Sequence, residues 1–172
     1  MYQYGGVIIR KFRYEDIPLK VKWVNNPENN QFLHYDIPID VSGTQKWFLS
    51  HIRDKARYDA VIEVDGKPVG TIGLLSIDQR NRKAEYYIAM GEPDYKGKGI
   101  AKKASMLLLK YGFENLDLNR IYLFTEIKNE AAQRLFERVG FVKEGILRHD
   151  IISHGKYVDR IVYGYLREDW RG

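Results

Sequence analysis

Apolar residues follow two different spacings along the chain, and each spacing predicts a different kind of element. Repeats every three or four residues are typical of helices with one buried face, whereas runs of β-branched and aromatic residues are typical of strands. Predicted helices cover residues 14–26, 42–54, 100–111 and 130–139. Predicted strands cover residues 7–12, 59–64, 68–77, 83–90 and 120–127, and residues 145–166 form a hairpin.

The two helices in the second half of the chain carry the clearest signals. Asn129 suits the N-cap of the later helix, and Gly140 suits its C-terminal end. The apolar stripe of the earlier helix consists of Ile100, Ala104, Leu107, Leu108 and Tyr111, and that of the later helix of Ala132, Leu135, Phe136 and Val139.

Turn residues divide the remaining segments. Asp65-Gly66 predicts a tight turn between two strands, and His154-Gly155 predicts another near the C-terminus. Residues 25–40 are rich in Asn and Pro, so we expect them to be largely irregular. The order of elements predicts a single mixed α/β domain over residues 1–172, with largely antiparallel strands.

Composition excludes several classes of protein. The chain has 172 residues, 44% of them hydrophobic, and no apolar run of the ~20 residues that a membrane helix needs. We expect no signal peptide and a cytoplasmic location. The absence of cysteine excludes disulfides, thiolate metal sites and an acyl-cysteine intermediate. Four histidines show no metal-ligand spacing, so we expect no metal: His34, His51, His149 and His154.

The segment GEPDYKGKGIAKKA, residues 91–104, combines glycines with positive charge at the start of a predicted helix. Lysines in the first turn oppose the helix macrodipole, unless an anion is bound there. Gly97 and Gly99 allow the backbone N–H groups to approach such an anion closely. The segment matches neither the dinucleotide fingerprint nor the Walker motif. It therefore predicts a phosphate site of another kind, with a loop of solvated lysines as the alternative.

This segment, followed about thirty residues later by NEAAQRLFERVGF, resembles the Gcn5-related N-acetyltransferase (GNAT) family, in particular its RimJ/RimL-like branch. The resemblance covers nearly the whole chain. It implies a central sheet flanked by helices and direct acetyl transfer from acetyl-CoA to an amine, with no metal. The family signature has Gln or Arg where this chain has Lys96.

The resemblance also implies which residues bind the cofactor. The backbone of one strand end would hold the pantetheine arm, the glycine segment would hold the pyrophosphate, and two further residues would lie beside the cofactor. These residues are Ile88, Ala89 and Met90; Lys96, Gly97, Lys98, Gly99, Ile100 and Ala101; and Asn129 and Phe136.

Two positions bear on the chemistry. Glu85 lies in the strand that leads to the cofactor loop, where the family often carries a glutamate, and we expect it to act as the general base. A cross-strand charge paired with Arg82 or Lys83 is the structural alternative. Many relatives have a tyrosine acid where this chain has Phe136, which cannot donate a proton, so a sensor without turnover stays possible.

The acceptor amine is the least determined part. The stretch KWVNNPENNQFL, residues 22–33, resembles amino-sugar N-acetyltransferases that act on nucleotide-linked sugars, and Asn26, Phe32, His34 and Glu85 are the expected acceptor-binding residues. A small amine or amino sugar ranks first and a protein N-terminus second. A polyamine ranks third, although residues 144–157 resemble spermidine acetyltransferases, because carboxylates such as Asp36 and Asp40 are scattered.

A basic nucleic-acid-binding domain is the alternative of a different class, because the net charge is +5. The aromatic residues fall in core-like stripes without a reading helix, which argues against nucleic acid as a partner. We also expect no membrane partner. Exposed strands near the C-terminus would permit a homodimer.

Overall fold

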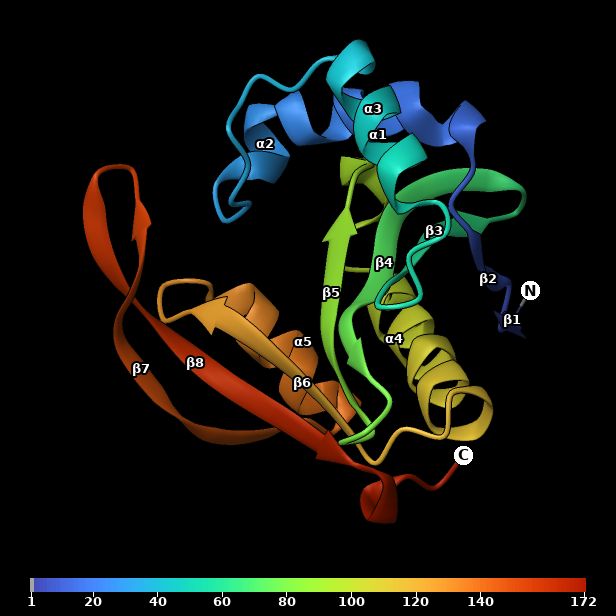
Figure 1. The fold of residues 1–172 in the computed structure, drawn as a ribbon, viewed down its shortest axis with the longest axis vertical. Coiled ribbons are helices and arrows are strands. Elements are labelled where there is room, and N and C mark those ends of the chain that lie inside the picture. Colours follow the sequence, from blue (N-terminus) through green and yellow to red (C-terminus); the bar gives the residue numbers. More distant parts are fainter. Residues whose placement is uncertain (1) are drawn as a thin grey trace.

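The computed structural model describes residues 2–172 and shows one twisted sheet that runs through the whole chain (Figure 1). Its strands lie in the order β1-β2-β3-β4-β5-β6-β8-β7. The strands are β1 (Tyr2–Tyr4), β2 (Val7–Lys11), β3 (Tyr58–Val64), β4 (Lys67–Asp78), β5 (Lys83–Met90), β6 (Arg120–Glu126), β7 (Val142–Ser153) and β8 (Lys156–Leu166). The helices are α1 (Ile17–Asn25), α2 (Pro27–Asn30), α3 (Val41–His51), α4 (Ile100–Lys110) and α5 (Glu130–Val139).

All neighbouring strands are antiparallel except β5 and β6, which are parallel and joined through α4. A parallel pair needs such a crossover, because its second strand must start at the same end as the first. The predicted mixed α/β fold with a largely antiparallel sheet and flanking helices is confirmed.

The sequence pattern missed several short elements, including a strand, a helical turn and a π-helical turn. β1 adds an edge strand beside β2, and α2 is a single helical turn inside the stretch that was expected to be largely irregular. A π-helical turn over Tyr111–Asn115 follows α4, so the Tyr111 position of the predicted stripe lies beyond the α-helix proper.

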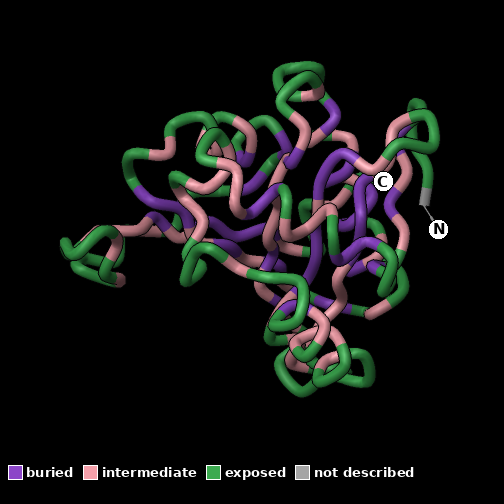
Figure 2. Tube along the Cα trace, turned by 90° about the horizontal axis from the view of Figure 1, so that it is seen from above, coloured by how far each residue is buried: buried purple, intermediate pink, exposed green. Residues whose placement is uncertain are grey.

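Helices cover both faces of the sheet, and the alternation of β3 shows how. Ala60 and Ile62 point to the main core, which α4 and α5 cover, whereas Val61 packs with Phe12 and Ile17 under α1 and α3. All three β3 residues are fully buried. Buried segments lie in the centre of the molecule and exposed ones in its loops (Figure 2). Among residues 2–172, no helix is long and apolar enough to cross a membrane.

Candidate active-site cleft

The parallel strands β5 and β6 separate after only three residue pairs. Lys83, Ala84 and Glu85 pair with Arg120, Ile121 and Tyr122, and no pairing follows beyond them. β5 continues to pair with β4 as far as Met90, and β6 with β8 as far as Glu126. The two strands therefore diverge like a V, with unpaired backbone along both inner edges (Figure 1).

A cleft of about 680 Å³ follows this opening and reaches α1, α2 and α3. Its lining includes most of the residues that the sequence predicted for a site: Glu85, Ile88, Ala89, Met90, Lys96, Ala101, Asn129, Phe136, Phe32 and His34. The cleft thus brings together residues from five separate stretches of the chain.

Glu85 lies where the two strands part, and its half-buried carboxyl makes no hydrogen bond or ion pair to any residue within 2–172. Burial raises the pKa of the Glu85 carboxyl above its ordinary value, and Arg160 opposes this shift in part. The alternative pairing with Arg82 is not formed, because Arg82 contacts Asp117 instead. An unpaired carboxyl with a raised pKa is suited to accept a proton.

A second carboxylate in the cleft was missed by the sequence analysis. Glu126 ends β6 and is 6% exposed, and its Oε1 lies 2.8 Å from Nε2 of His34. This contact ties the segment after α2 to β6 across the cleft. The sequence signal for Glu126 was a charged residue at the last position of a strand whose buried positions alternate. This signal can be recognised only when the end of the strand is known.

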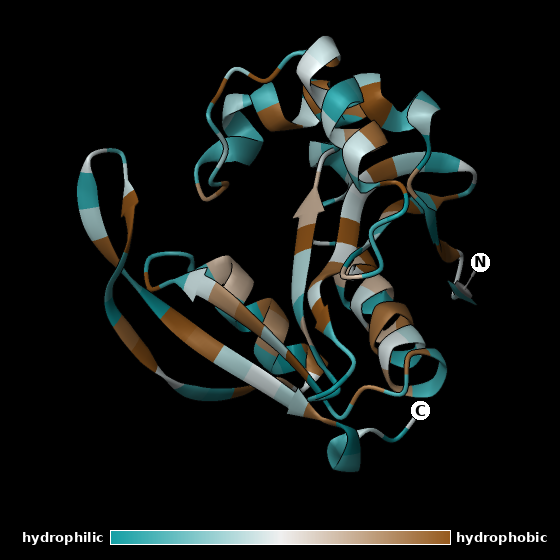
Figure 3. Cartoon of the chain, in the orientation of Figure 1, coloured by the Kyte–Doolittle hydropathy of each residue, from teal (hydrophilic) through white to brown (hydrophobic). Residues whose placement is uncertain are grey.

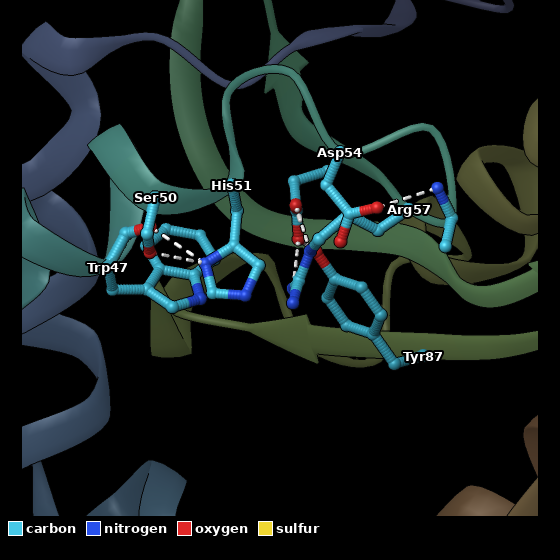
Figure 4. Close-up of polar contacts among 8 residues, drawn as sticks. Trp47, Ser50, His51, Asp54, Arg57 and Tyr87 are labelled. Atoms are coloured by element: carbon cyan, nitrogen blue, oxygen red, sulfur yellow. Dashed lines mark hydrogen bonds and ion pairs between the residues drawn. The ribbon is translucent and has the colours of Figure 1, made fainter.

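A third group, also missed, lies on the wall formed by β3 and β5. Arg57 donates to both carboxylate oxygens of Asp59 at 2.8 and 2.9 Å, and the Tyr87 hydroxyl donates to Asp59 at 2.7 Å. Burial alone would raise the pKa of Asp59, but these hydrogen bonds outweigh it and the pKa lies below its ordinary value. Figure 4 shows Arg57, just before β3, and Tyr87, on β5, with their side chains pointing toward one another.

Aromatic rings surround Lys20 beside this group. Lys20 Nζ lies 3.4 Å from the ring centroid of Trp47 and 5.8 Å from those of Phe12 and Tyr35. His51 holds Trp47 in place, because their rings are 5.8 Å apart and Nδ1 of His51 lies 2.8 Å from the Trp47 carbonyl oxygen (Figure 4). Burial lowers the pKa of Lys20 to about 8.

The glycine segment fits a phosphate group. Gly97 and Gly99 have φ of +75° and +76°, and a Cβ at either position would meet no atom within 4 Å. None of the N–H groups of Gly97, Lys98 and Gly99 donates to an acceptor within residues 2–172. Helix α4 begins directly afterwards with no acidic residue in its first turn. Free amides at a helix start in open space are typical of an anion site.

Several predicted residues lie outside the cleft lining. Gly97, Lys98, Gly99 and Ile100 belong to the segment between Lys96 and Ala101, both of which do line it. Asn26 also lies outside, since its Oδ1 accepts from the Glu28 amide at 3.0 Å and caps α2.

Lys96 and Asn129 have partners within the protein. The ammonium of Lys96 donates to Asn29 Oδ1 at 2.8 Å, which joins the loop before α4 to α2. Asn129 caps α5 as predicted, because its Oδ1 accepts from the Ala132 amide at 3.2 Å. Asp40 caps α3, and neither it nor Asp36 lines the cleft.

The end of β5 is fastened to α1 and α2. A Cβ at Gly91 would lie only 2.2 Å from the Trp23 ring, so this ring packs directly on the glycine backbone. Trp23 Nε1 donates to Glu92 at 2.8 Å, and Asn29 donates to the Gly91 carbonyl at 2.8 Å. These contacts fix one wall of the cleft relative to the glycine segment.

Phe136 lies between the cleft and the core. It is 6% exposed and meets the Tyr86 ring edge-on, with centroids 5.8 Å apart. The Tyr86 hydroxyl forms a hydrogen bond of 2.7 Å with Ser105, away from Phe136. Within residues 2–172, no three His, Asp or Glu side chains gather in a way that could hold a metal ion.

Comparison with known proteins gives a consistent result. The family profile of the acetyltransferase (GNAT) domain matches residues 7–142. Spermidine N(1)-acetyltransferase of Escherichia coli K12 is 37% identical over 111 residues, which are 64% of this chain and 59% of that protein. A putative ribosomal N-acetyltransferase of Bacillus subtilis, YdaF, is 38% identical over 66% of this chain and 62% of that protein. The chain thus matches about three fifths of the length of these two relatives.

Among solved structures, the spermidine N-acetyltransferase of Vibrio cholerae in complex with CoA and spermine superposes with a TM-score of 0.89. It is 27% identical, and the match covers 96% of this chain and 98% of that one. The similarity therefore extends over the whole sheet, including the β7–β8 hairpin beyond the family profile.

Proposed function

The chain belongs to the acetyltransferase (GNAT) family, and on that premise we propose that it transfers the acetyl group of acetyl-CoA directly to a primary amine. The observation that carries this proposal is the opening between β5 and β6. The Glu85 carboxyl, which has no partner within residues 2–172, lies where the opening begins, and free backbone amides lie at the start of α4. The positive charge of the glycine segment then serves an anionic co-substrate rather than nucleic acid.

The residues present fit acetyl-CoA, which supplies an activated acetyl thioester when bound. The amides of residues 97–101 would hold its pyrophosphate, because they are free and no side chain blocks them. The backbone of Ile88, Ala89 and Met90, unpaired on the side facing β6, would hold the pantetheine arm. Asn129 and Phe136, from the start and the middle of α5, line the same cleft.

Glu85 takes the proton that an alkylammonium acceptor must lose before it can attack the acetyl carbon. Its raised pKa makes it a stronger base than an exposed glutamate. The neutral amine would then form the amide bond as the carbon–sulfur bond breaks, and the nitrogen would lose its second proton to solvent. Phe136 has no proton to give, so the departing thiolate would take a proton from solvent or another hydroxyl, or leave unprotonated.

The acceptor is proposed to be a small molecule, with an amino sugar or its nucleotide ranking first. The aromatic lining formed by Trp23, Phe32, Tyr35 and Trp47 supports a ring-shaped acceptor. A polyamine is the second candidate. It is favoured by the carboxylates of Glu85 and Glu126 in the cleft, and the relatives named for spermidine add weight to it. A protein N-terminus becomes the third candidate, supported by the B. subtilis relative.

An acceptor screen that follows the release of free thiol from acetyl-CoA tests the function. We expect turnover with at least one class among amino sugars, their nucleotides, polyamines and short peptides with free N-termini. Stabilisation of the protein by acetyl-CoA in a thermal shift assay is the companion measurement. A protein that neither binds acetyl-CoA nor acetylates any of these amines would contradict the proposal.

We further propose that the chain associates with copies of itself through the β7–β8 hairpin. The hairpin carries exposed apolar residues at the edge of the sheet, with Ile152 64% and Tyr157 66% exposed. Exposed apolar residues on a hairpin at the edge of a sheet are typical of an interface.

A further inference from the structure

We propose that the acceptor amine carries an anionic group, which the Lys20 ammonium binds inside a box of aromatic rings formed by Phe12, Tyr35 and Trp47. This inference rests on the proposed acetyltransferase function and names the class of acceptor for the same cleft. The group would be a carboxylate or a phosphate at the end of the acceptor remote from the reacting amine.

The first observation is that the Lys20 ammonium has no partner of opposite charge within ion-pair distance, although the charge of Asp59 acts on it from farther away. It makes no hydrogen bond and no ion pair to any residue within 2–172, and its contacts are with the three rings of the box. Removing an ammonium from water without such a partner is unfavourable, and cation–π contact compensates only part of the penalty. The lowered pKa of Lys20 has the same cause, because burial disfavours the charged ammonium.

The second observation is that the nearby carboxylate is already engaged. Asp59 accepts three hydrogen bonds, two from Arg57 and one from Tyr87. Arg57 also lies 5.2 Å from the centroid of the Trp47 ring, so a second cation faces the same ring as Lys20. This end of the cleft therefore has a surplus of positive charge.

The third observation is that the opposite charge lies elsewhere on the same face of the sheet. Glu85 and Tyr87 are two residues apart on β5 and so point to the same side, where Tyr87 contacts Asp59. Glu85 has no partner within the described residues. The cleft thus offers one free carboxylate and one free ammonium, which suits a dipolar acceptor with an amine at Glu85 and an anion at Lys20.

The same arrangement disfavours a polyamine. A second ammonium on the acceptor would have to enter the aromatic box beside Lys20 and Arg57, and two like charges in a partly desolvated site repel. An acceptor with an uncharged remote end would leave the Lys20 ammonium without an ion-pair partner.

Three acceptors of equal chain length separate these cases. Pentylamine, 1,5-diaminopentane and 5-aminopentanoate differ only in the group remote from the reacting amine. Glucosamine and glucosamine 6-phosphate form a second set. It tests a phosphate, whereas 5-aminopentanoate in the first set tests a carboxylate. We expect the anionic member of at least one set to have the highest kcat/KM. Preference for 1,5-diaminopentane or spermidine over all the anionic amines would overturn the inference.

Variants of Lys20 assign any preference to this residue. Lys20→Met keeps the apolar stem and removes the charge, and we expect kcat/KM for the anionic acceptor to fall about 30-fold or more, and by much more than kcat/KM for pentylamine. Lys20→Glu should move the preference toward 1,5-diaminopentane. Lys46→Met, an exposed neighbour of Trp47 on α3, is the matched control and should leave both values unchanged. An equal loss for charged and uncharged acceptors in Lys20→Met would contradict the inference.

A measurement without turnover separates failure of the inference from failure of the proposed function. Pentanoate, which cannot be acetylated, is titrated into protein whose lysines carry ¹³C-methyl groups, and the Lys20 signal is assigned with Lys20→Met. We expect pentanoate or inorganic phosphate to raise the pKa of Lys20 from about 8. No change with either anion would overturn the anion site. A raised pKa without acetyl transfer to any amine would retain the anion site and refute the acetyltransferase function.

Discussion

Glu85 owes its chemical character to where β5 and β6 separate. Its carboxyl is half-buried by the two strands but has no hydrogen-bond partner within residues 2–172, so burial raises its pKa without a donor to lower it again. An ionised base is required for proton transfer, so activity should fall as the pH drops through the pKa of Glu85. Because that pKa is raised, the fall should begin at a higher pH than for an exposed glutamate.

Glu85→Gln therefore should lower kcat by about 100-fold or more and remove this acidic limb from the pH–rate profile. Glutamine has nearly the same shape as glutamate, so the affinity for acetyl-CoA measured by calorimetry should stay the same. Glu168→Gln, at an exposed position outside the cleft, is the matched control. A wild-type profile in Glu85→Gln would exclude Glu85 as the base.

Single residues were predictable from the sequence where a motif or a cap marked them. Asn129 is an N-cap as its position before an apolar stripe predicted. Glu126 and Lys20 were missed, because each acquires its role from side chains distant in the sequence. Asp59 has a partner two residues away in Arg57, but its contact with Tyr87 lies 28 residues away and gives no local signal. His34 lies 92 residues from Glu126, and no local spacing connects the two.

At the scale of elements, the start of α4 allows a controlled test. Gly99 and Gly66 share φ of +76° and +77°, and neither has an atom within 4 Å of an added Cβ. Gly99→Glu and Gly66→Glu should therefore lose similar unfolding free energy, about 1 kcal/mol each, from backbone strain. Only Gly99→Glu places a carboxylate beside the amides of the phosphate site.

We expect Gly99→Glu to weaken acetyl-CoA binding by more than about 10-fold because of charge repulsion and blocked access, and Gly66→Glu to bind like wild type. Calorimetric titration measures both, and chemical denaturation checks that both fold. Equal affinities in the two variants would remove the glycine segment from the cofactor site.

The junction of α1 with β5 gives a second test. A methyl group in Gly91→Ala would overlap the Trp23 ring, so the ring and α1 must shift, at a cost of about 1–3 kcal/mol in unfolding free energy. Since α1 carries Lys20 and borders the cleft, the KM of the acceptor should rise more than the Kd of acetyl-CoA.

Gly145→Ala is the control for Gly91→Ala, because the nearest atom to its added methyl lies 3.9 Å away. Its stability and both constants should remain close to wild type. Steady-state kinetics with varied acceptor and calorimetry with acetyl-CoA supply the numbers. An unchanged acceptor KM in Gly91→Ala would show that Trp23 packing does not position this wall.

Most elements could be predicted from periodicity, because their buried faces repeat strongly. The divergence of β5 from β6 could not, since both strands look continuous in sequence and the extent of pairing depends on what packs between them. The single turn of α2 was missed for another reason: it has no buried residue to create a pattern, and only Asn26 and Pro27 mark its start.

For the whole molecule, the β7–β8 hairpin should determine self-association. Apolar segments recur along it (Figure 3), and Val142, Ile146 and Ile152 are each at least 50% exposed. Ile152→Lys should shift the protein toward smaller species in light scattering after size-exclusion chromatography, because the charge would have to be desolvated in an interface. Leu49→Lys, at a 62% exposed apolar position on α3, should not. A wild-type monomer at all concentrations would contradict this expectation.

The overall architecture followed from the order of elements together with the family resemblance. Strand order was not derivable from periodicity alone: β8 lies between β6 and β7, so the last hairpin inserts its second strand next to β6. The arrangement depends on which strand of the hairpin pairs with the free edge of β6, and this choice leaves no local pattern in the sequence.

The separation of β5 from β6 also bears on solubility. Unpaired peptide groups on an outer strand invite a neighbouring chain to add to the sheet, whereas those on the inner edges of these two strands face one another within a single molecule. The protein can thus keep hydrogen-bonding backbone available to a slender ligand while denying it to another polypeptide, so this opening needs no charged or proline residues to guard it against aggregation.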